Sequence, residues 1–215
     1  MKRKLGIALA GGGIRAYVQI GVLKVLEEKD IKIDCIAGTS MGSIIAALTA
    51  AGAKSEQLTM AMFELEKQFA DRKVFLRPNL RVLPFAKNKL DGFVDADTFE
   101  SMIQEQFEKF DVNKISDLKM LIAITAVDLV SGKLVVFTNV PNRFINDNDK
   151  IIISDGLITQ AVRASCSFPI VFSTKKYEKM QLVDGGVKMN LPVQLLKTMQ
   201  SNRILSVTMD GQPIF

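Results

Sequence analysis

The sequence predicts an α/β protein, a three-layer α/β/α sandwich whose mostly parallel central sheet carries helices on both faces. Short apolar runs typical of buried strands alternate with amphipathic stretches of helical period along the 215 residues. Glycine-rich turns follow the first two apolar runs, between each strand and the helix that succeeds it. A composition of 48% hydrophobic and 24% charged residues is that of a globular protein. We expect a single domain over residues 1–215.

Two strand–turn–helix units are expected first. Leu5–Ala10 precedes a helix over Ile14–Glu28, and Ile31–Ala37 precedes a helix over Ser43–Ala51 that Gly52 ends as a C-cap. The buried face of the first helix is assigned to apolar residues at helical spacing, namely Val18, Val22, Val25 and Leu26. The basic start followed by an apolar run is also typical of a signal peptide. The run has only six residues, fewer than the roughly 7–15 of such segments, so a strand is favoured.

The middle of the chain adds two helices and two strands. Apolar residues spaced by four, three and four predict a helix over Ser55–Phe69. Asp97 and Glu100 form a D-x-x-E capping pattern at the start of the next helix. Leu121–Val127 and Leu134–Phe137 are expected strands on either side of a Ser-Gly turn.

The last part of the chain continues the alternation. We expect a helix over Asp155–Ser165, a strand over Gln181–Val183, a helix over Leu195–Gln200 and a strand over Ile204–Met209. The sequence stops six residues after this strand. Since a helix usually covers the last strand of an α/β sheet, we expect natural C-terminal residues to continue beyond Phe215.

The cysteines and the apolar runs indicate the compartment. No apolar stretch approaches the ~18 residues that a membrane span needs. Cys35 and Cys166 lie in apolar surroundings, as buried reduced thiols do in the cytosol, although a single disulfide stays possible. We expect a cytoplasmic protein.

Residues 71–91 hold most of the basic excess. Six Lys or Arg and two Asp give this segment +4 of the chain's +5. It also holds apolar residues without a clear period, among them Val74, Phe75, Leu76, Leu80, Val82, Leu83 and Phe85. Two interpretations stay open: a solvated loop whose apolar residues pack on the core, and a flap in peripheral contact with an anionic membrane surface. The segment lacks Tyr and Trp and no recognised motif accompanies it, so we expect no nucleic-acid partner.

The absence of histidine restricts the chemistry most. It excludes Ser-His-Asp and Cys-His catalysis within this sequence, and His-ligated zinc. Two cysteines are also too few for an all-Cys metal site. A nucleophile in this sequence therefore needs another base, and we expect no metal or other cofactor.

The turn Gly11-Gly12-Gly13 follows the first expected strand and precedes a helix. Glycines allow successive N–H groups to face one point, and a helix N-terminus adds positive potential, so the turn is suited to an anion. A phosphate cradle and an oxyanion hole both use this geometry. A dinucleotide site would also need a carboxylate about 20 residues on. The acidic residues near that distance are Glu28, Asp30 and Asp34.

The turn after the second expected strand has the pattern of a nucleophile elbow. It reads Gly38, Thr39, Ser40, Met41 and Gly42. Glycines on both sides relieve crowding in such a strained turn, which exposes the serine hydroxyl at the start of the next helix. Ser40 could also merely cap that helix. The glycine turn upstream favours a nucleophile, because an oxyanion hole and a serine elbow complement each other in acyl transfer.

The candidate base is Asp184, in the turn Asp184-Gly185-Gly186 after a short strand. Taken alone this pattern is typical of an ordinary turn, but with a serine elbow and no histidine the carboxylate becomes the leading partner of Ser40. Reference pKa values of about 3.9 for Asp and 6.5 for His differ by roughly 2.6 units, or about 3.5 kcal/mol. Burial, which raises the pKa of a carboxylate, and oxyanion donors worth about 2.7–4 kcal/mol each would offset this difference.

These three turns, in this order, resemble the patatin-like phospholipase family. The resemblance extends to residues 161–165, to Phe168-Pro169, and to Asn190 and Pro192, so it covers nearly the whole chain. It implies that Ser40 is the nucleophile, that Asp184 is the base, and that the glycine turn is the oxyanion hole. The implied activity is hydrolysis of acyl esters in phospholipids or related lipids through an acyl-enzyme, without a metal.

One position departs from the family pattern: Ala16 stands where the family commonly has glycine. Arg15 is a candidate for orienting the glycine turn or for contacting a lipid phosphate, with a structural ion pair as the alternative. Two other functions stay open, a non-catalytic lipid- or phosphate-binding protein on the same scaffold and a dinucleotide-binding enzyme.

Overall fold

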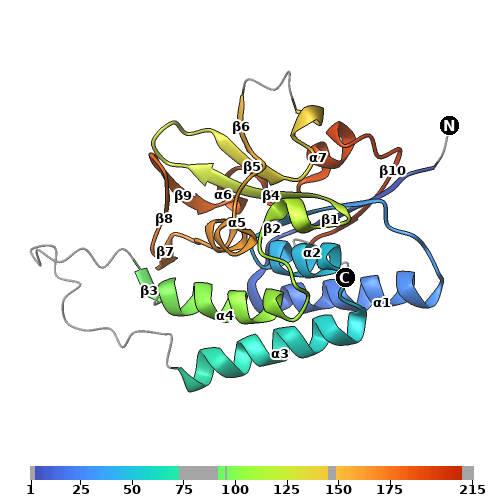
Figure 1. Cartoon of the computed structure of the whole chain (residues 1–215), viewed down its shortest axis with the longest axis horizontal. Coiled ribbons are helices and arrows are strands. Elements are labelled where there is room, and N and C mark those ends of the chain that lie inside the picture. The colour runs from blue at the N-terminus through green and yellow to red at the C-terminus, as the bar shows by residue number, and fades with distance from the viewer. Residues whose placement is uncertain (1–2, 73–91, 95, 145–148, 210–215) are drawn as a thin grey trace, which may run out of the picture.

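The computed structural model describes residues 3–72, 92–94, 96–144 and 149–209 (Figure 1). Nearly all of the basic segment expected at 71–91 therefore lies outside the described residues. Its first two residues are described: Asp71 ends a helix, and Arg72 pairs with Glu105 at 2.8 Å.

The central sheet joins eight strands. Six follow the order β10-β1-β2-β4-β5-β6, while β9 also pairs with β4, and β8 with β9. Their bounds are β1 Leu5–Leu9, β2 Cys35–Thr39, β4 Leu121–Asp128, β5 Leu134–Thr138, β6 Lys150–Ile153, β8 Lys175–Tyr177, β9 Met180–Asp184 and β10 Arg203–Val207. The pairs β10–β1, β1–β2, β2–β4 and β5–β6 are parallel, whereas β4–β5, β4–β9 and β8–β9 are antiparallel. A small second sheet pairs β3 (Gly92–Val94) with β7 (Ile170–Phe172).

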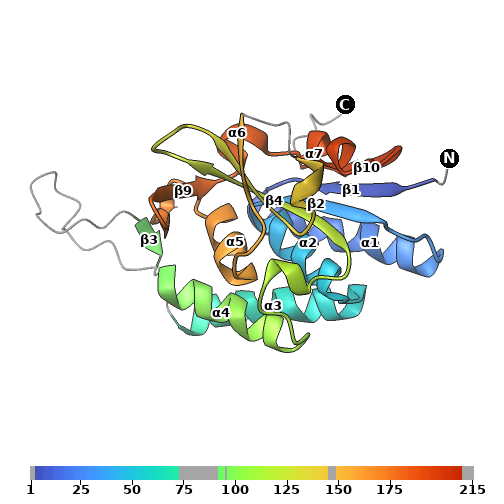
Figure 2. The ribbon, with the colours of Figure 1, turned by 45° about the horizontal axis from the view of Figure 1, so that its top comes forward.

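Helices cover both faces of the sheet, in unequal numbers (Figures 1 and 2). One face carries α1 Val18–Glu28, α2 Met41–Ala51 and α5 Ile158–Ser165, with α3 Ser55–Asp71 and α4 Ala96–Glu108 packed outside them. The other face carries the shorter α6 Gly186–Met189 and α7 Val193–Thr198. Strand alternation separates two cores, since Ile7 and Leu9 pack under the larger helices and Ala8 packs under α7. The predicted α/β class is confirmed.

The first expected helix is divided, and its predicted buried face is correct only at Leu26. A 3-10 turn, η1 (Gly13–Tyr17), precedes α1, and the buried residues of α1 are Gln19, Ile20, Leu23 and Leu26. Val18 and Val25 are exposed. Apolar residues occur on several sides of this helix, and burying the larger Ile and Leu side chains removes more apolar surface from water. The rotation of the helix was therefore decided by packing.

Other boundaries shift by a few residues. The capping pattern predicted Asp97 as the N-cap of α4. The helix instead starts at Ala96, so Asp97 lies inside its first turn. The helix α5 starts at Ile158 instead of Asp155. Gly52 ends α2 in the left-handed conformation, with φ of 106°, as predicted.

Two observations bear on the predicted state of the cysteines and on the predicted lack of a membrane span. Cys35 and Cys166 are buried and form no disulfide. Burial is the main cause that raises the pKa of both thiols. No helix in the described part of the chain has the length and apolar character to cross a bilayer.

Candidate active site

Two strands that end at the same point of β4 bring Ser40 and Asp184 together. The strand β2 runs parallel to β4 and pairs Thr39 with Thr125, whereas β9 runs antiparallel and pairs Asp184 with Ala126. Both lie on the side of β4 away from β5, because β5 pairs with residues 123–127 on its other side. The carboxyl ends of β2 and β9 therefore meet head to head, and the two predicted residues become neighbours.

Ser40 occupies a strained elbow. Its φ of 53° and ψ of −130° lie in a region that residues other than glycine rarely adopt. Its N–H donates to the Ser165 hydroxyl oxygen at 2.8 Å, and its carbonyl accepts from the Ser43 N–H at 2.8 Å. This is the strand–turn–helix geometry of a nucleophile elbow.

The elbow glycines are required by close approach. A Cβ atom added at Gly42 would lie 2.5 Å from the carbonyl oxygen of Ala10, and one at Gly38 would lie 2.5 Å from the carbonyl oxygen of Gly42. Thr39 is buried and its hydroxyl donates to the Met189 carbonyl at 2.9 Å. These contacts hold the elbow against both the first strand and α6.

Asp184 is a buried carboxyl group with one satisfied oxygen. Its Oδ1 accepts the Gly186 N–H at 2.7 Å, and its own N–H donates to the Ser167 carbonyl at 3.0 Å. Burial raises the pKa of the carboxyl, while the neighbouring Ser40 hydroxyl and the Gly186 N–H oppose the rise. Oδ2 is buried and has no partner with hydrogen-bond geometry in the described structure. The Ser40 hydroxyl therefore lies beside the carboxylate without completing a hydrogen bond, as is common in sites without substrate.

The glycine turn touches the elbow directly. A Cβ atom at Gly11 would lie 2.9 Å from Cβ of Ser40 and 2.8 Å from Oδ1 of Asn190. The Gly11 N–H already donates to Asn190 Oδ1 at 3.1 Å. Gly12 and Gly13 precede and begin η1, and Gly13 has φ of 57°. N–H groups at the start of a helical turn have no acceptor within it, so these two amides are suited to an oxyanion.

Asn190 and Ser165 are contacts to which sequence reasoning assigned no role. Asn190 joins the glycine turn to the segment after Asp184, and Ser165 holds the elbow amide from the end of α5. Only the family resemblance pointed to these positions, because neither lies in a pattern with a local signal. Gly185 is similarly constrained, since a Cβ atom there would lie 2.1 Å from the Thr125 hydroxyl oxygen.

The Ser40–Asp184 pair opens into a cavity of about 580 Å³. An adjoining cavity of about 540 Å³ shares Met41, Phe69, Phe99, Val171 and Phe172 with it. The Phe99 ring lies 5.2 Å from that of Phe69 and 5.0 Å from that of Phe172, centroid to centroid. The lining of the second cavity is apolar apart from Tyr17 and Glu66. Space for a long apolar group thus adjoins the serine.

The two arginines near the site differ. Arg15 is exposed at the edge of the Ser40 cavity and forms no ion pair with a described residue, so a structural ion pair is not seen there. Arg163 is buried, donates to the Ser167 hydroxyl and the Ser173 carbonyl, and lies 5.3 Å from the centre of the Phe172 ring. Arg163 therefore supports the segment that holds the Asp184 amide.

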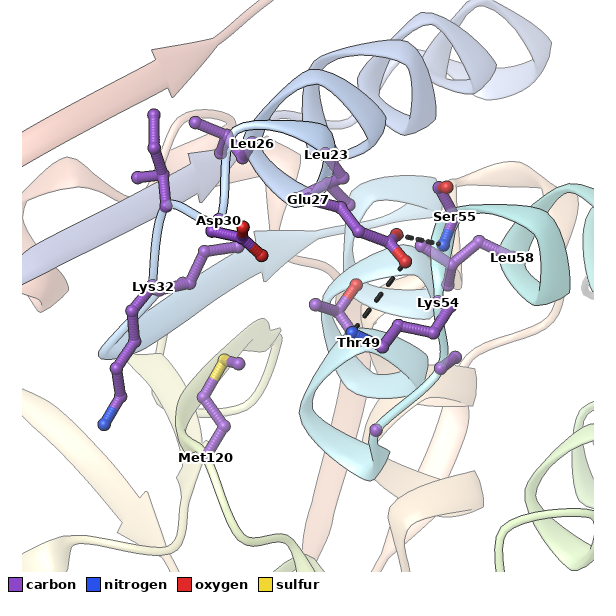
Figure 3. A pocket seen from close by; sticks show the side chains of 14 residues that line it. Leu23, Leu26, Glu27, Asp30, Lys32, Thr49, Lys54, Ser55, Leu58 and Met120 are labelled. Carbon is purple, nitrogen blue, oxygen red and sulfur yellow. Dashed lines mark hydrogen bonds and ion pairs between the residues drawn. The ribbon is translucent and has the colours of Figure 1, made fainter.

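A third cavity, of about 370 Å³, lies at the opposite end of β2 (Figure 3). Of the charged residues that line it, Glu27 accepts the Ser55 N–H at 2.9 Å and lies 3.8 Å from the Lys54 ammonium group. These contacts hold the start of α3. The described residues contain no cluster of three or more His, Cys, Asp or Glu side chains that could hold a metal.

The carboxylates expected for a dinucleotide site lie at the wrong edge of the sheet. Asp34 precedes β2 and its Oδ2 accepts the Leu5 N–H at 2.9 Å, at the start of β1. Glu28 is the last residue of α1, and Asp30 follows that helix at the same end. The glycine turn follows the other end of β1, so these carboxylates cannot hold a ribose bound beside it.

Known proteins resemble this chain in family and in fold. A family model described as patatin-like phospholipase matches residues 7–197. The uncharacterized protein YqhO of Bacillus subtilis is 29% identical over 207 residues, which are 93% of this chain and 69% of that protein. Lysophospholipase nte1 of Aspergillus niger is 31% identical over 205 residues, 95% of this chain but only 12% of that protein. VipD from Legionella pneumophila, with a TM-score of 0.51 and 12% identity, covers 99% of this chain and 51% of its own, and supports the fold alone.

Proposed function

The chain belongs to the patatin-like phospholipase family, and from that premise we propose that it is a serine lipid acyl hydrolase. Its substrates are carboxylic esters of phospholipids or related lipids. The observation that carries the proposal is the meeting of Ser40 with a buried carboxylate at the floor of a largely apolar cavity. The relative named a lysophospholipase supports the same class of substrate.

In the proposed first step, Oγ of Ser40 attacks the ester carbonyl carbon and Oδ2 of Asp184 takes the hydroxyl proton. The negative charge that develops on the carbonyl oxygen is stabilised by the amides of Gly12 and Gly13. Collapse of this intermediate breaks the ester bond. The leaving alcohol takes the proton from Asp184, and the acyl group stays on Ser40.

In the proposed second step, water attacks the acyl-enzyme while Asp184 accepts a proton from that water. Collapse releases the fatty acid, and the proton returns from Asp184 to the Ser40 oxygen. The raised pKa of Asp184 makes its carboxylate a stronger base than an exposed carboxylate. The difference in basicity between this carboxylate and the imidazole of a histidine is therefore smaller.

A fluorophosphonate probe tests the nucleophile. We expect mass spectrometry to find one adduct, on Ser40, and none on a Ser40→Ala variant of equal thermal stability. We also expect fatty acid release from phospholipid by the native protein and not by the variant. An unmodified Ser40 in folded protein that still binds lipid would favour the non-catalytic binding protein instead.

A further inference from the structure

Four exposed apolar side chains line the cavities of the proposed acyl-hydrolase site or stand beside lining residues in the sequence. Ile14 is 64% exposed, Val18 65%, Phe168 57% and Val187 55%. Phe168 lines the Ser40 cavity and Ile14 lines the adjoining apolar cavity. Val18 follows Ile14 by one helical turn, and Val187 follows Gly186, which lines the Ser40 cavity. These four residues, here called the apolar rim, are therefore exposed on the segments that line the two cavities.

Packing within the chain does not explain the apolar rim. Val18 is an apolar residue that helical spacing assigned to the core, yet the buried face of α1 is formed by other residues. Exposed apolar side chains grouped at one place mark interaction sites, whereas scattered ones are ordinary.

The occupant must both cover the apolar rim and leave the two cavities accessible. A folded protein seated on Ile14 and Phe168 would cover the two cavities that these residues line. A lipid surface instead supplies the apolar molecule that the cavity accepts. Arg15, exposed beside Ile14 and without an ion pair among the described residues, adds a positive charge that complements lipid phosphate.

We propose that the apolar rim docks on a phospholipid bilayer. Its four side chains insert among the acyl chains, Arg15 contacts head-group phosphate, and the ester passes from the bilayer into the cavity without crossing water. The proposal rests on the proposed lipid hydrolase function and assigns the docking to residues outside the basic segment 71–91.

Serine substitutions on α1 and α6 test the proposal, with a control substitution on α1. Neither Val18 nor Val187 lines the cavities, so Val18→Ser with Val187→Ser removes apolar rim surface and leaves the site intact. Val25→Ser is the control. Val25 is 53% exposed, two turns further on the same side of α1, which runs away from α5 and β9 (Figure 1).

Vesicles of phosphatidylcholine with a minor fraction of phosphatidylglycerol are used in a flotation assay, in a Ser40→Ala background that prevents turnover. We expect the double variant to bind about tenfold or more weakly, because each valine loses part of its burial in lipid. We expect Val25→Ser to bind as its parent does. Equal binding by the double variant, an equal loss in Val25→Ser, or no binding by the parent would overturn the proposal.

Hydrolysis with Ser40 present separates this proposal from the proposed function. We expect the double variant to cleave a water-soluble short-chain ester at the native rate and vesicle phospholipid about tenfold more slowly. If the native protein cleaves neither substrate, the hydrolase function fails, whereas flotation still decides the docking. Equal rates on vesicles would refute docking alone.

Discussion

Asp184→Asn should abolish activity and stabilise the fold. The buried carboxylate of Asp184 is the proposed base for catalysis, but its burial lowers the stability of the folded protein. Asp184 is 2% exposed, and its Oδ2 is buried without a hydrogen-bond partner in the described structure. The asparagine amide has the same shape. Its Oδ1 can still accept the Gly186 N–H, and its Nδ2 can donate to the Ser40 hydroxyl oxygen.

The expected gain in stability arises because the variant no longer buries the unpaired carboxylate oxygen Oδ2 of Asp184. An unsatisfied buried polar group costs about 1–3 kcal/mol, so the free energy of unfolding at neutral pH should rise by about that amount. For a chain of this size each kcal/mol moves the melting temperature by about 2–4 °C. Activity should fall nearly as far as in Ser40→Ala, since the variant has no base.

The pH dependence of this stability gain tests whether the buried carboxylate of Asp184 is its cause. Burial raises the pKa of Asp184 in the native state above that in the unfolded chain, so the native protein holds the proton more tightly. The carboxyl therefore favours folding most below the unfolded pKa of about 3.9, and this contribution is lost as pH rises through the native pKa. The stability gain of Asp184→Asn should be full at neutral pH and shrink towards about pH 4.

Urea unfolding of the native protein, Asp184→Asn and Ser40→Ala between about pH 4 and 8 measures this difference. Ser40→Ala controls for lost activity, because it keeps the carboxyl group and should show no gain that shrinks in acid. An asparagine variant that is less stable than the native protein at neutral pH would refute the desolvation argument. Near-native rates in that variant would refute the role of Asp184 as base.

Three further predictions concern the residues around the elbow. Gly11→Ala should lose most activity, because the new methyl group would lie 2.9 Å from Cβ of Ser40. The control Gly21→Ala, which has open space in α1, should keep its rate and gain about 0.5–1 kcal/mol of stability. Equal rates for the two variants would contradict this expectation. Ser165→Ala leaves the Ser40 N–H without its acceptor, so kcat should fall more than KM rises in steady-state kinetics, and an unchanged kcat would count against it. Cys166 is buried with a strongly raised pKa, so iodoacetamide at neutral pH should label it only after unfolding, and fast labelling of the native protein would disprove that expectation.

Local patterns in the sequence were enough to predict the fold class and to single out the three turns that meet at the candidate site. The two glycines around Ser40 predict a strained elbow because the crowding they relieve arises within a few residues and from the strand beside them. The absence of histidine directed attention to a carboxylate as base. The strands β1, β2 and β4 were also predicted, since buried strands have a strong apolar signal.

Only the tertiary structure decided which residues meet. Ser40 and Asp184 adjoin because two registers along β4, Thr39 with Thr125 and Asp184 with Ala126, place two strand ends face to face. Backbone hydrogen bonds between distant segments set such registers, and no local pattern specifies them. The rotation of α1 was also decided by tertiary packing. Apolar residues occur on several sides of this helix, and the side that packs on the core does not include Val18, which is exposed.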